Sequence, residues 1–100
     1  MIRITERSQT ATAVVLKVEG ELLHEDAAVL AEEGGRWMQH VKELVLDFRW
    51  LQTIKPTGLE LLQSWPQVRV IVDLEEGSVV RHLLEAHGLG DRIMESPDPP

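Results

Sequence analysis

One hundred residues, of which 43 % are apolar and 27 % charged, are enough for one soluble domain with a single core. The absence of cysteine excludes disulfides, thiolate nucleophiles and zinc–thiolate sites. A formal charge of −7, with the ten Lys and Arg residues scattered, argues against nucleic acid as a partner. No apolar run reaches the roughly 18 residues of a membrane span and no signal-peptide pattern opens the chain, so we expect a cytoplasmic protein without membrane insertion.

The first twenty residues predict a hairpin. Ile2–Thr5 alternates apolar and polar residues, as a half-buried edge strand does, and Ala13–Val18 is a more continuously apolar strand. Arg7–Thr10 is the predicted polar turn between them. Gly20 is predicted to end the second strand.

An amphipathic helix is predicted from Ala27, with Asp26 as its N-cap. Its apolar stripe consists of Leu30, Trp37, Met38 and Val41. The Gly34-Gly35 pair weakens this helix, because each glycine inside a helix costs roughly 1 kcal/mol relative to alanine. Either the helix backbone packs closely on a sheet at this point, or the helix breaks and re-forms.

Strands and helices alternate in the rest of the chain. The predicted elements are a buried strand at Leu44–Phe48, a helix at Pro56–Trp65 stopped by Pro66, a strand at Val68–Val72, a helix capped by Ser78 and ended by Gly88, and a short last strand at Arg92–Met94. The order β-β-α-β-α-β-α predicts an α/β fold, with a mixed central sheet of about four to five strands and helices packed on it. We expect one domain over residues 1–94 and a disordered tail over 95–100, which has nothing to bury.

Three segments together resemble the STAS (sulfate transporter and anti-sigma factor antagonist) domain, over roughly residues 12 to 93. Val18–Leu22 resembles the Gly-Glu-Leu that ends the family's second strand. Val45–Phe48, followed ten residues later by Gly58-Leu59, resembles the strand, loop and start of the family's switch helix. Ser78–Leu89 is similar to the family's late helix.

The resemblance implies a regulatory module in which a partner kinase phosphorylates a serine at the start of the switch helix. The family's Asp-Ser-Ser/Thr-Gly reads Lys55-Pro56-Thr57-Gly58 here. Pro56 has no hydroxyl, so phosphorylation at that position is ruled out. Only nine residues lie between Gly58 and the next strand at Val68, a shorter path than is usual in the family.

Each residue of this altered motif has a structural and a functional interpretation. Lys55 is either aimed at an acidic partner or a bound anion, or is solvated. Pro56 suits the first position of a helix. Thr57 is the remaining hydroxyl, hence a candidate phosphosite or an ordinary surface residue, and Gly58 permits close approach of the helix to the sheet or to a partner.

Four further residues complete the predicted partner-binding surface. Glu21, Leu22 and His24 belong to the turn after the second strand. Trp50 lies in the loop before the altered motif and is either an interface anchor or a cover over the core edge.

No other set of residues indicates chemistry. The four histidines lack the spacing of a metal site, and Asp73, Glu75 and Glu76 are interpreted as a solvated acidic turn. No Walker or Gly-x-Gly-x-x-Gly motif is present. We therefore expect no enzymatic activity, no metal and no cofactor.

The leading hypothesis is a bacterial anti-sigma-factor-antagonist-like module that binds an anti-sigma factor or switch kinase and cannot be phosphorylated at the usual serine position. An alternative is an accessory STAS subunit that docks on a transporter ATPase. A third is an enzyme or ligand-binding protein with a deep polar pocket. A homodimer is also considered.

Overall fold

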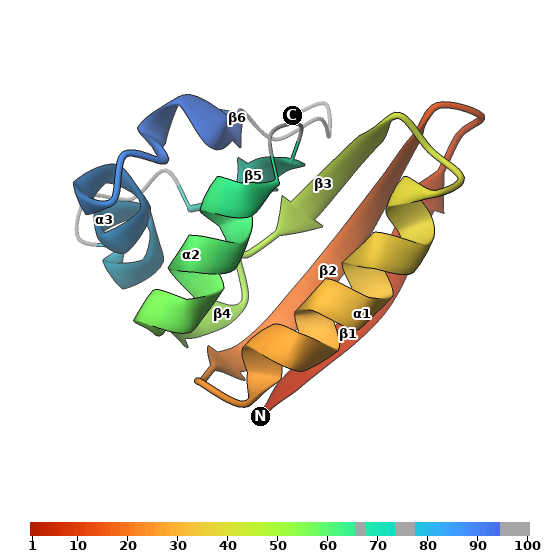
Figure 1. Ribbon diagram of the computed structural model, residues 1–100. Helices are drawn as coiled ribbons and strands as arrows, with labels where there is room; N and C mark the ends of the chain where they lie inside the picture. The colour runs from red at the N-terminus through yellow and green to blue at the C-terminus, as the bar shows by residue number, and fades with distance from the viewer. Residues whose placement is uncertain (66–67, 74–77, 95–100) are drawn as a thin grey trace.

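The computed structural model describes residues 1–65, 68–73 and 78–94, which form a six-stranded sheet with helices packed against it (Figure 1). The strands are β1 (Ile2–Gln9), β2 (Ala13–Leu22), β3 (Glu43–Asp47), β4 (Leu51–Ile54), β5 (Val68–Ile71) and β6 (Ile93–Met94). The helices are α1 (Asp26–Met38), α2 (Pro56–Ser64), α3 (Val79–Ala86) and the 3-10 helix η1 (Gly90–Arg92). The predicted α/β class with a mixed sheet is confirmed.

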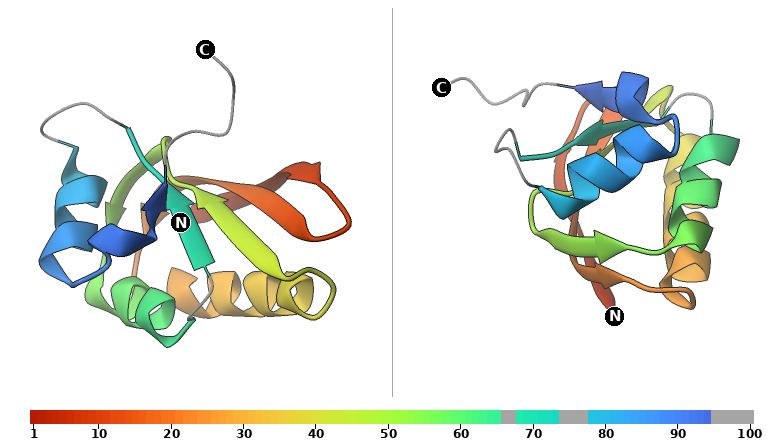
Figure 2. Two further views of the ribbon diagram at one scale, coloured as in Figure 1. Left: turned by 90° about the horizontal axis from the view of Figure 1, so that it is seen from above. Right: turned by 90° about the vertical axis from the view of Figure 1, so that its left-hand side faces the viewer.

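The sheet runs β1-β2-β3-β5-β6, and β4 pairs with β2 beyond the end of β3. β1 is antiparallel to β2, and the remaining pairs are parallel. Helices α1 and α2 lie side by side on one face of the sheet (Figure 2). We call the opposite side the outer face.

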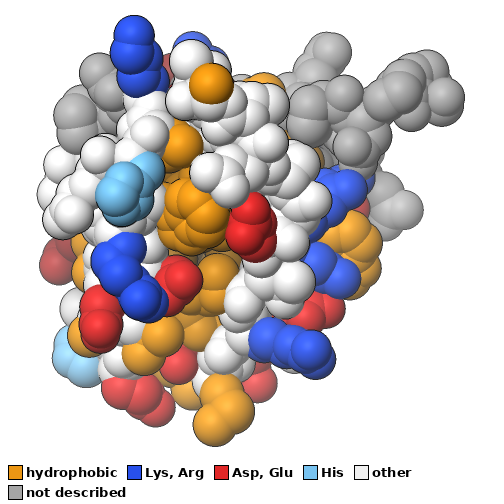
Figure 3. All heavy atoms as spheres, turned by 90° about the vertical axis from the view of Figure 1, so that its right-hand side faces the viewer, with side chains coloured by type: hydrophobic (Ala, Val, Ile, Leu, Met, Phe, Trp, Pro, Cys, Tyr) orange, Lys and Arg blue, Asp and Glu red, His pale blue; other side chains and the backbone are white. Residues whose placement is uncertain are grey.

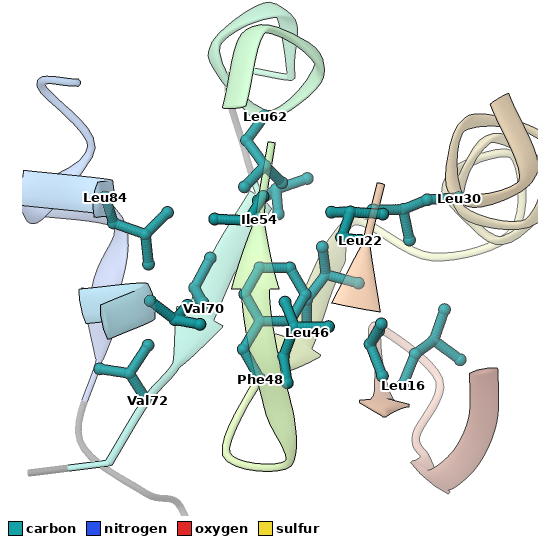
Figure 4. Packing of buried hydrophobic residues seen from close by; sticks show 14 of the residues in the cluster. Leu16, Leu22, Leu30, Leu46, Phe48, Ile54, Leu62, Val70, Val72 and Leu84 are labelled. Atoms are coloured by element: carbon teal, nitrogen blue, oxygen red, sulfur yellow. The ribbon is translucent and has the colours of Figure 1, made fainter. Parts of the chain in front are cut away.

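The core lies between the sheet and the helices (Figure 4). Leu16, Leu46 and Val70 from the strands meet Leu30 of α1 and Leu62 of α2 there. Alternate residues of β2 point inward, as the period of two of a strand requires, and Leu44 and Leu46 of β3 join the same core. The residues between them belong to the outer face.

The hairpin turn differs from the prediction. β1 continues through Gln9, and the turn lies at residues 10–12, where the Thr10 hydroxyl accepts a hydrogen bond from the Ala13 amide at 3.0 Å. The predicted turn at Arg7–Thr10 was wrong because a bulge between Glu6 and Ser8 keeps the polar end of β1 paired with β2.

Gly20 lies inside β2 and does not end it. Its φ of +100° forms an irregularity in the pairing, after which β2 continues to Leu22. A Cβ at this position would lie 2.4 Å from the Met1 carbonyl oxygen. A side chain at residue 20 would clash with this carbonyl, so glycine allows β2 to continue to Leu22.

One strand, β4, was predicted as loop. β4 has four residues, Leu51–Ile54, of which the first and last are buried and the middle two are more exposed. An apolar-polar pattern of four residues is too short to be identified as a strand from sequence. β4 exists because it continues along β2 where β3 stops, with Leu22 opposite Ile54. The strand count of six exceeds the expected four to five for this reason.

Helix α1 is continuous through Gly34 and Gly35, so the helix does not break there, and close packing explains the first of the two glycines. A Cβ on Gly34 would lie 2.7 Å from Cη2 of Trp65 and 3.2 Å from Cδ2 of Leu44. Gly34 thereby lets α1 approach the end of α2 and the strand β3.

The later elements agree with the prediction. The Ser78 hydroxyl accepts from the Arg81 amide at 3.3 Å and caps α3. Gly88, with φ of +73°, ends it, and the Leu89 amide donates to the Leu84 carbonyl at 2.8 Å. β6 is the short strand expected at Arg92–Met94.

Three predictions fall wholly or partly outside the described residues. They are the stop at Pro66, the acidic turn at Glu75 and Glu76, and the disordered tail over 95–100.

Candidate functional site

The turn after β2 and the start of α2 meet at one place, which we call the β2–α2 corner and define by Glu21, His24, Lys55, Pro56 and Thr57. Pairing of β4 with the end of β2 brings these two segments together. The Lys55 amide donates to the Leu22 carbonyl at 2.9 Å immediately before α2 begins. The sheet thus fixes the position of the helix start.

His24 and Thr57 form a side-chain contact across the corner. His24 Nδ1 lies 3.0 Å from Thr57 Oγ1, although 33 residues separate the two in the chain. His24 is exposed and Thr57 half-buried. The remaining hydroxyl of the altered motif is therefore hydrogen-bonded to an imidazole at the surface.

Helix α2 begins with an exposed cation and a proline. Lys55 is the N-cap in an extended conformation, φ −85° and ψ 162°, and makes no side-chain cap. Pro56 is in the first turn at N1, as predicted, where its missing amide removes no helical hydrogen bond. Lys55, Pro56 and Glu21 are exposed and so accessible to a partner.

Asp26 supports the turn that carries His24. Its carboxylate accepts from the Leu23 amide at 2.9 Å and lies 3.2 Å from the ammonium of Met1. Burial, with 6 % of the residue exposed, tends to raise the pKa of Asp26, but the Leu23 hydrogen bond and the ammonium charge outweigh it and hold the pKa below its ordinary value. The predicted N-cap role was wrong: Glu25 is the N-cap, because Asp26 turns back toward Leu23.

Leu22 and Gly58 lie beneath the corner. Leu22 is 0 % exposed and Gly58 is buried. A Cβ on Gly58 would lie 2.7 Å from Leu22 Cδ2 and 3.0 Å from Ile54 Cγ1. These two predicted contact residues consequently shape the corner from inside, and Gly58 permits close approach to the sheet.

Trp50 lies away from the corner. It precedes β4 whereas Lys55 follows it, so the two backbones are separated by roughly 16 Å at the usual rise of a strand. Lys17 Nζ lies 4.1 Å and Arg49 Cζ 5.0 Å from the centre of the Trp50 ring. Lys17 is an outer-face residue of β2, which places Trp50 with that face.

Sequence reasoning missed an ion-pair cluster at the end of β3. Asp47 is 0 % exposed, and its Oδ2 lies 2.7 Å from Arg7 Nη1 and 2.7 Å from Arg49 Nη2. The signal in the sequence was a carboxylate within the apolar run Leu44–Phe48. A charge in such a position requires paired partners when buried.

Metal ligands and surface hollows are two further features that could mark a site. Within residues 1–65, 68–73 and 78–94, no group of three His, Cys, Asp or Glu side chains is placed to hold a metal ion. Shallow hollows of about 250 and 240 Å³ lie near the C-terminal end of α1, away from the corner. They are lined by Met38, Val41, Lys42 and Leu44 and by Glu33, Arg36, Trp37 and His40.

Comparison with solved structures identifies the architecture. The anti-sigma factor antagonist SpoIIAA in its unphosphorylated form is similar with a TM-score of 0.71 and 20 % identity, over 96 % of this chain and 90 % of that one. An anti-sigma factor antagonist from Mycobacterium paratuberculosis is similar with a TM-score of 0.75 and 19 % identity, over 98 % of this chain and 87 % of that one. The fold is that of the anti-sigma factor antagonists. The phosphorylated form of the Bacillus cell fate determinant SpoIIAA also has this fold, with a TM-score of 0.64 and 17 % identity over 96 % and 93 %.

Identities of 17 to 20 % establish the STAS fold alone. No model of a protein family matches the sequence, and a search of curated proteins found no match. In the described part of the chain, no helix is both long and apolar enough to cross a membrane.

Proposed function

We propose that the chain is a non-enzymatic regulatory module that docks on a protein partner through the β2–α2 corner. Support comes from the STAS fold, whose solved relatives are named anti-sigma factor antagonists. The exposed residues that gather at the corner, His24 and Lys55 among them, come from separate segments. By this analogy the partner is an anti-sigma factor or a switch kinase of a bacterial cytoplasm.

The observation that carries the proposal is Pro56 at N1 of α2. The family resemblance assigns the phosphorylated serine to this position, and SpoIIAA is known in phosphorylated and unphosphorylated forms. A phosphate adds about two negative charges and changes what a surface can bind. With proline in place of serine, the corner keeps one charge state at this position.

Thr57 is the alternative acceptor at the corner. Its hydroxyl is half-buried and contacts His24 Nδ1 at 3.0 Å. A kinase would have to break this contact in order to bring the hydroxyl into its own active site. The proposed module therefore docks without phosphate on Thr57.

The first test is partner capture from the native cell, with identification of the bound protein. We expect an anti-sigma factor or a switch kinase to bind the wild type and to be lost from His24→Ala/Lys55→Glu. Lys42→Glu is the matched control, because it reverses a charge near the other end of α1. Recovery of a transporter ATPase instead would favour the accessory-subunit alternative.

The second test uses the captured kinase and mass spectrometry. Wild type should remain unmodified, whereas Lys55→Asp/Pro56→Ser should gain one phosphate at residue 56. Phosphate on the wild-type chain, at Thr57 or elsewhere, would contradict the proposal of a corner in one charge state.

A further inference from the structure

The end of α2 is held by a segment that follows it by 27 to 30 residues in the chain. We call this segment, which consists of η1 and β6, the strap. Nη1 of Arg92 donates to the carbonyls of Leu62, at 3.2 Å, and Trp65, and it lies 3.4 Å from the Val68 carbonyl. One guanidinium nitrogen thereby joins the last turn of α2 to the start of β5.

Arg92 differs from the arginines that form surface ion pairs. Arg36 pairs with Glu33 on α1, where both side chains are exposed. Figure 3 shows this side of the molecule, with α1 at the left and basic side chains next to acidic ones. Among the described residues Arg92 has no carboxylate partner, and its side chain donates to main-chain carbonyls. Its charge therefore acts on the end of a helix.

Helix α2 has no cation of its own at this end. Its last turn contains no basic residue, although the carbonyl end of a helix favours positive charge. The last carbonyls of a helix also lack intrahelical donors. The Ser64 hydroxyl donates to the Leu61 carbonyl at 2.6 Å, and the Trp65 amide donates to the Leu62 carbonyl at 3.2 Å. Arg92 supplies the missing charge and a donor to the Trp65 carbonyl, so it completes the cap of α2 from outside the helix.

A second hydrogen bond joins the last turn of α2 to the residues just before the strap. Nε2 of Gln63 donates to the carbonyl of His87, the C-cap of α3, at 2.8 Å. The other end of α2 is joined to β2, because the Lys55 amide donates to the Leu22 carbonyl at 2.9 Å. Helix α2 is therefore held at both ends by segments that are distant in the chain.

Few interactions hold the strap on the sheet. β6 has two residues, which pair with β5 as Val70 with Ile93 and Ile71 with Met94. It is the last strand of the sheet, and both of its residues are only half-buried. Short elements at an edge open at a lower free energy than the core of a domain. The strap can therefore open while β2 and β3 stay paired.

The two ends of α2 depend on each other because the helix is short. It has nine residues, whereas isolated helices shorter than roughly 12–15 residues are marginal in water. Its order comes from packing and from the hydrogen bonds at its two ends. Loss of the Arg92 contacts therefore loosens the whole helix, including Thr57, whose side chain contacts His24 at the corner.

We propose that the strap is a conformational control element of the β2–α2 corner. When the strap is closed on α2 through Arg92, it holds the corner in one position, and when it opens, the corner loses its order. Arg92 is a positioning residue, because it acts on the corner through α2. The effect on docking rests on the function proposed above, whereas the effect on the order of the corner does not.

The test is amide hydrogen exchange of the full chain, measured residue by residue by NMR. The amides of Gly58 and Leu59 report the corner end of α2, because they donate to the Lys55 carbonyl at 2.9 and 3.2 Å. We expect Arg92→Met to speed their exchange, and that of the Trp65 amide, by about tenfold or more, while β2 and β3 exchange as in wild type.

Two further variants control for charge and for general loss of an arginine. Arg92→Lys keeps the charge but not the guanidinium geometry, so its exchange should lie between wild type and Arg92→Met. Arg81→Met is the matched control, because Arg81 is also half-buried and pairs with Glu85 within α3. It should leave α2 as in wild type. Thermal melting checks that all three variants fold.

Two patterns of exchange would overturn the proposal. Equal acceleration in α2, β2 and β3 would mean that Arg92 contributes only to global stability. Acceleration confined to the Trp65 amide would mean that the last turn frays without effect on the corner. With the captured partner, Arg92→Met should also weaken binding. Failure of wild type to capture a partner would contradict the docking function, while the exchange result is obtained on the chain alone.

Discussion

Two glycines of this chain differ in the space around them. Gly58 is packed against Leu22 and Ile54, at 2.7 and 3.0 Å from the position a Cβ would take. At Gly35 of α1, no described atom outside the adjacent residues and the nearby helix backbone lies within 4 Å of that position. The same change to alanine should therefore have opposite effects at the two sites.

We expect Gly58→Ala to lower the free energy of unfolding by about 1–3 kcal/mol, because the new methyl overpacks a closed part of the core. Gly35→Ala should raise it by up to about 1 kcal/mol, since alanine favours the helix. Urea denaturation followed by circular dichroism measures both. A neutral Gly58→Ala would show that α2 moves away from the sheet at little cost.

Asp26 makes stability depend on pH. Its pKa in the folded protein lies below the ordinary value of 3.8, so its contribution is present above that pH and is lost as pH falls through the folded-state pKa. We expect the wild type to lose stability in acid more steeply than Asp26→Asn. Chemical denaturation over an acidic pH series tests this. If the free energy of unfolding fell with pH in parallel for the wild type and Asp26→Asn, a role for Asp26 would be excluded.

At the scale of single residues, sequence predicts what depends on neighbours in the chain. Pro56 at N1 and Ser78 as a cap follow from local rules, and both are confirmed. The contact between His24 and Thr57 depends on the path of the 33 residues between them. No local pattern indicates it.

Among the elements, the Asp47 cluster ties β1 to β3 across β2. Arg7 comes from β1, and Arg49 follows β3. Both guanidinium groups bind one carboxylate that is 0 % exposed. Removal of that charge leaves two cations facing each other.

Asp47→Asn should therefore destabilise the fold by about 2 kcal/mol, as expected for the loss of one partner in a buried ion pair. Glu33→Gln is the matched control, because its pair with Arg36 is exposed and should contribute less than about 0.5 kcal/mol. Guanidinium denaturation is unsuitable because salt screens charges, so urea is used. If Asp47→Asn and Glu33→Gln lowered the free energy of unfolding equally, a structural role for Asp47 would be contradicted.

The elements that sequence predicted well carry a strong apolar signal, which is a helical period in α1 and a continuous apolar run in β3. β4 was missed because its pairing is set by β2, which continues past the end of β3. The length of β1 was underestimated because its second half is polar and exposed. Its pairing comes from the partner strand and a bulge, neither of which is visible in the residues of β1.

In the whole molecule, β1 is an edge strand of eight residues. It carries exposed charges at Arg3 and Glu6. Charged side chains on an edge oppose pairing with another chain. The fold therefore protects its longest open edge by charge.

We expect the wild type to remain monomeric across a range of concentrations, while Arg3→Thr/Glu6→Thr associates through β1. Light scattering after size exclusion measures the mass of each. Lys42→Glu serves as a control for a general charge effect. If the wild type forms a dimer and the double variant does not associate more strongly, the homodimer interface does not lie on β1.

The packing of Trp65 on Gly34 provides the protein with its own optical probe. The chain has three tryptophans and no tyrosine, so its ultraviolet emission comes from indole rings. Trp50 is already 46 % exposed, whereas Cη2 of Trp65 lies 2.7 Å from where a Gly34 Cβ would be. A red shift from Trp65 in a variant lacking the other two tryptophans would then report the separation of α1 from the end of α2.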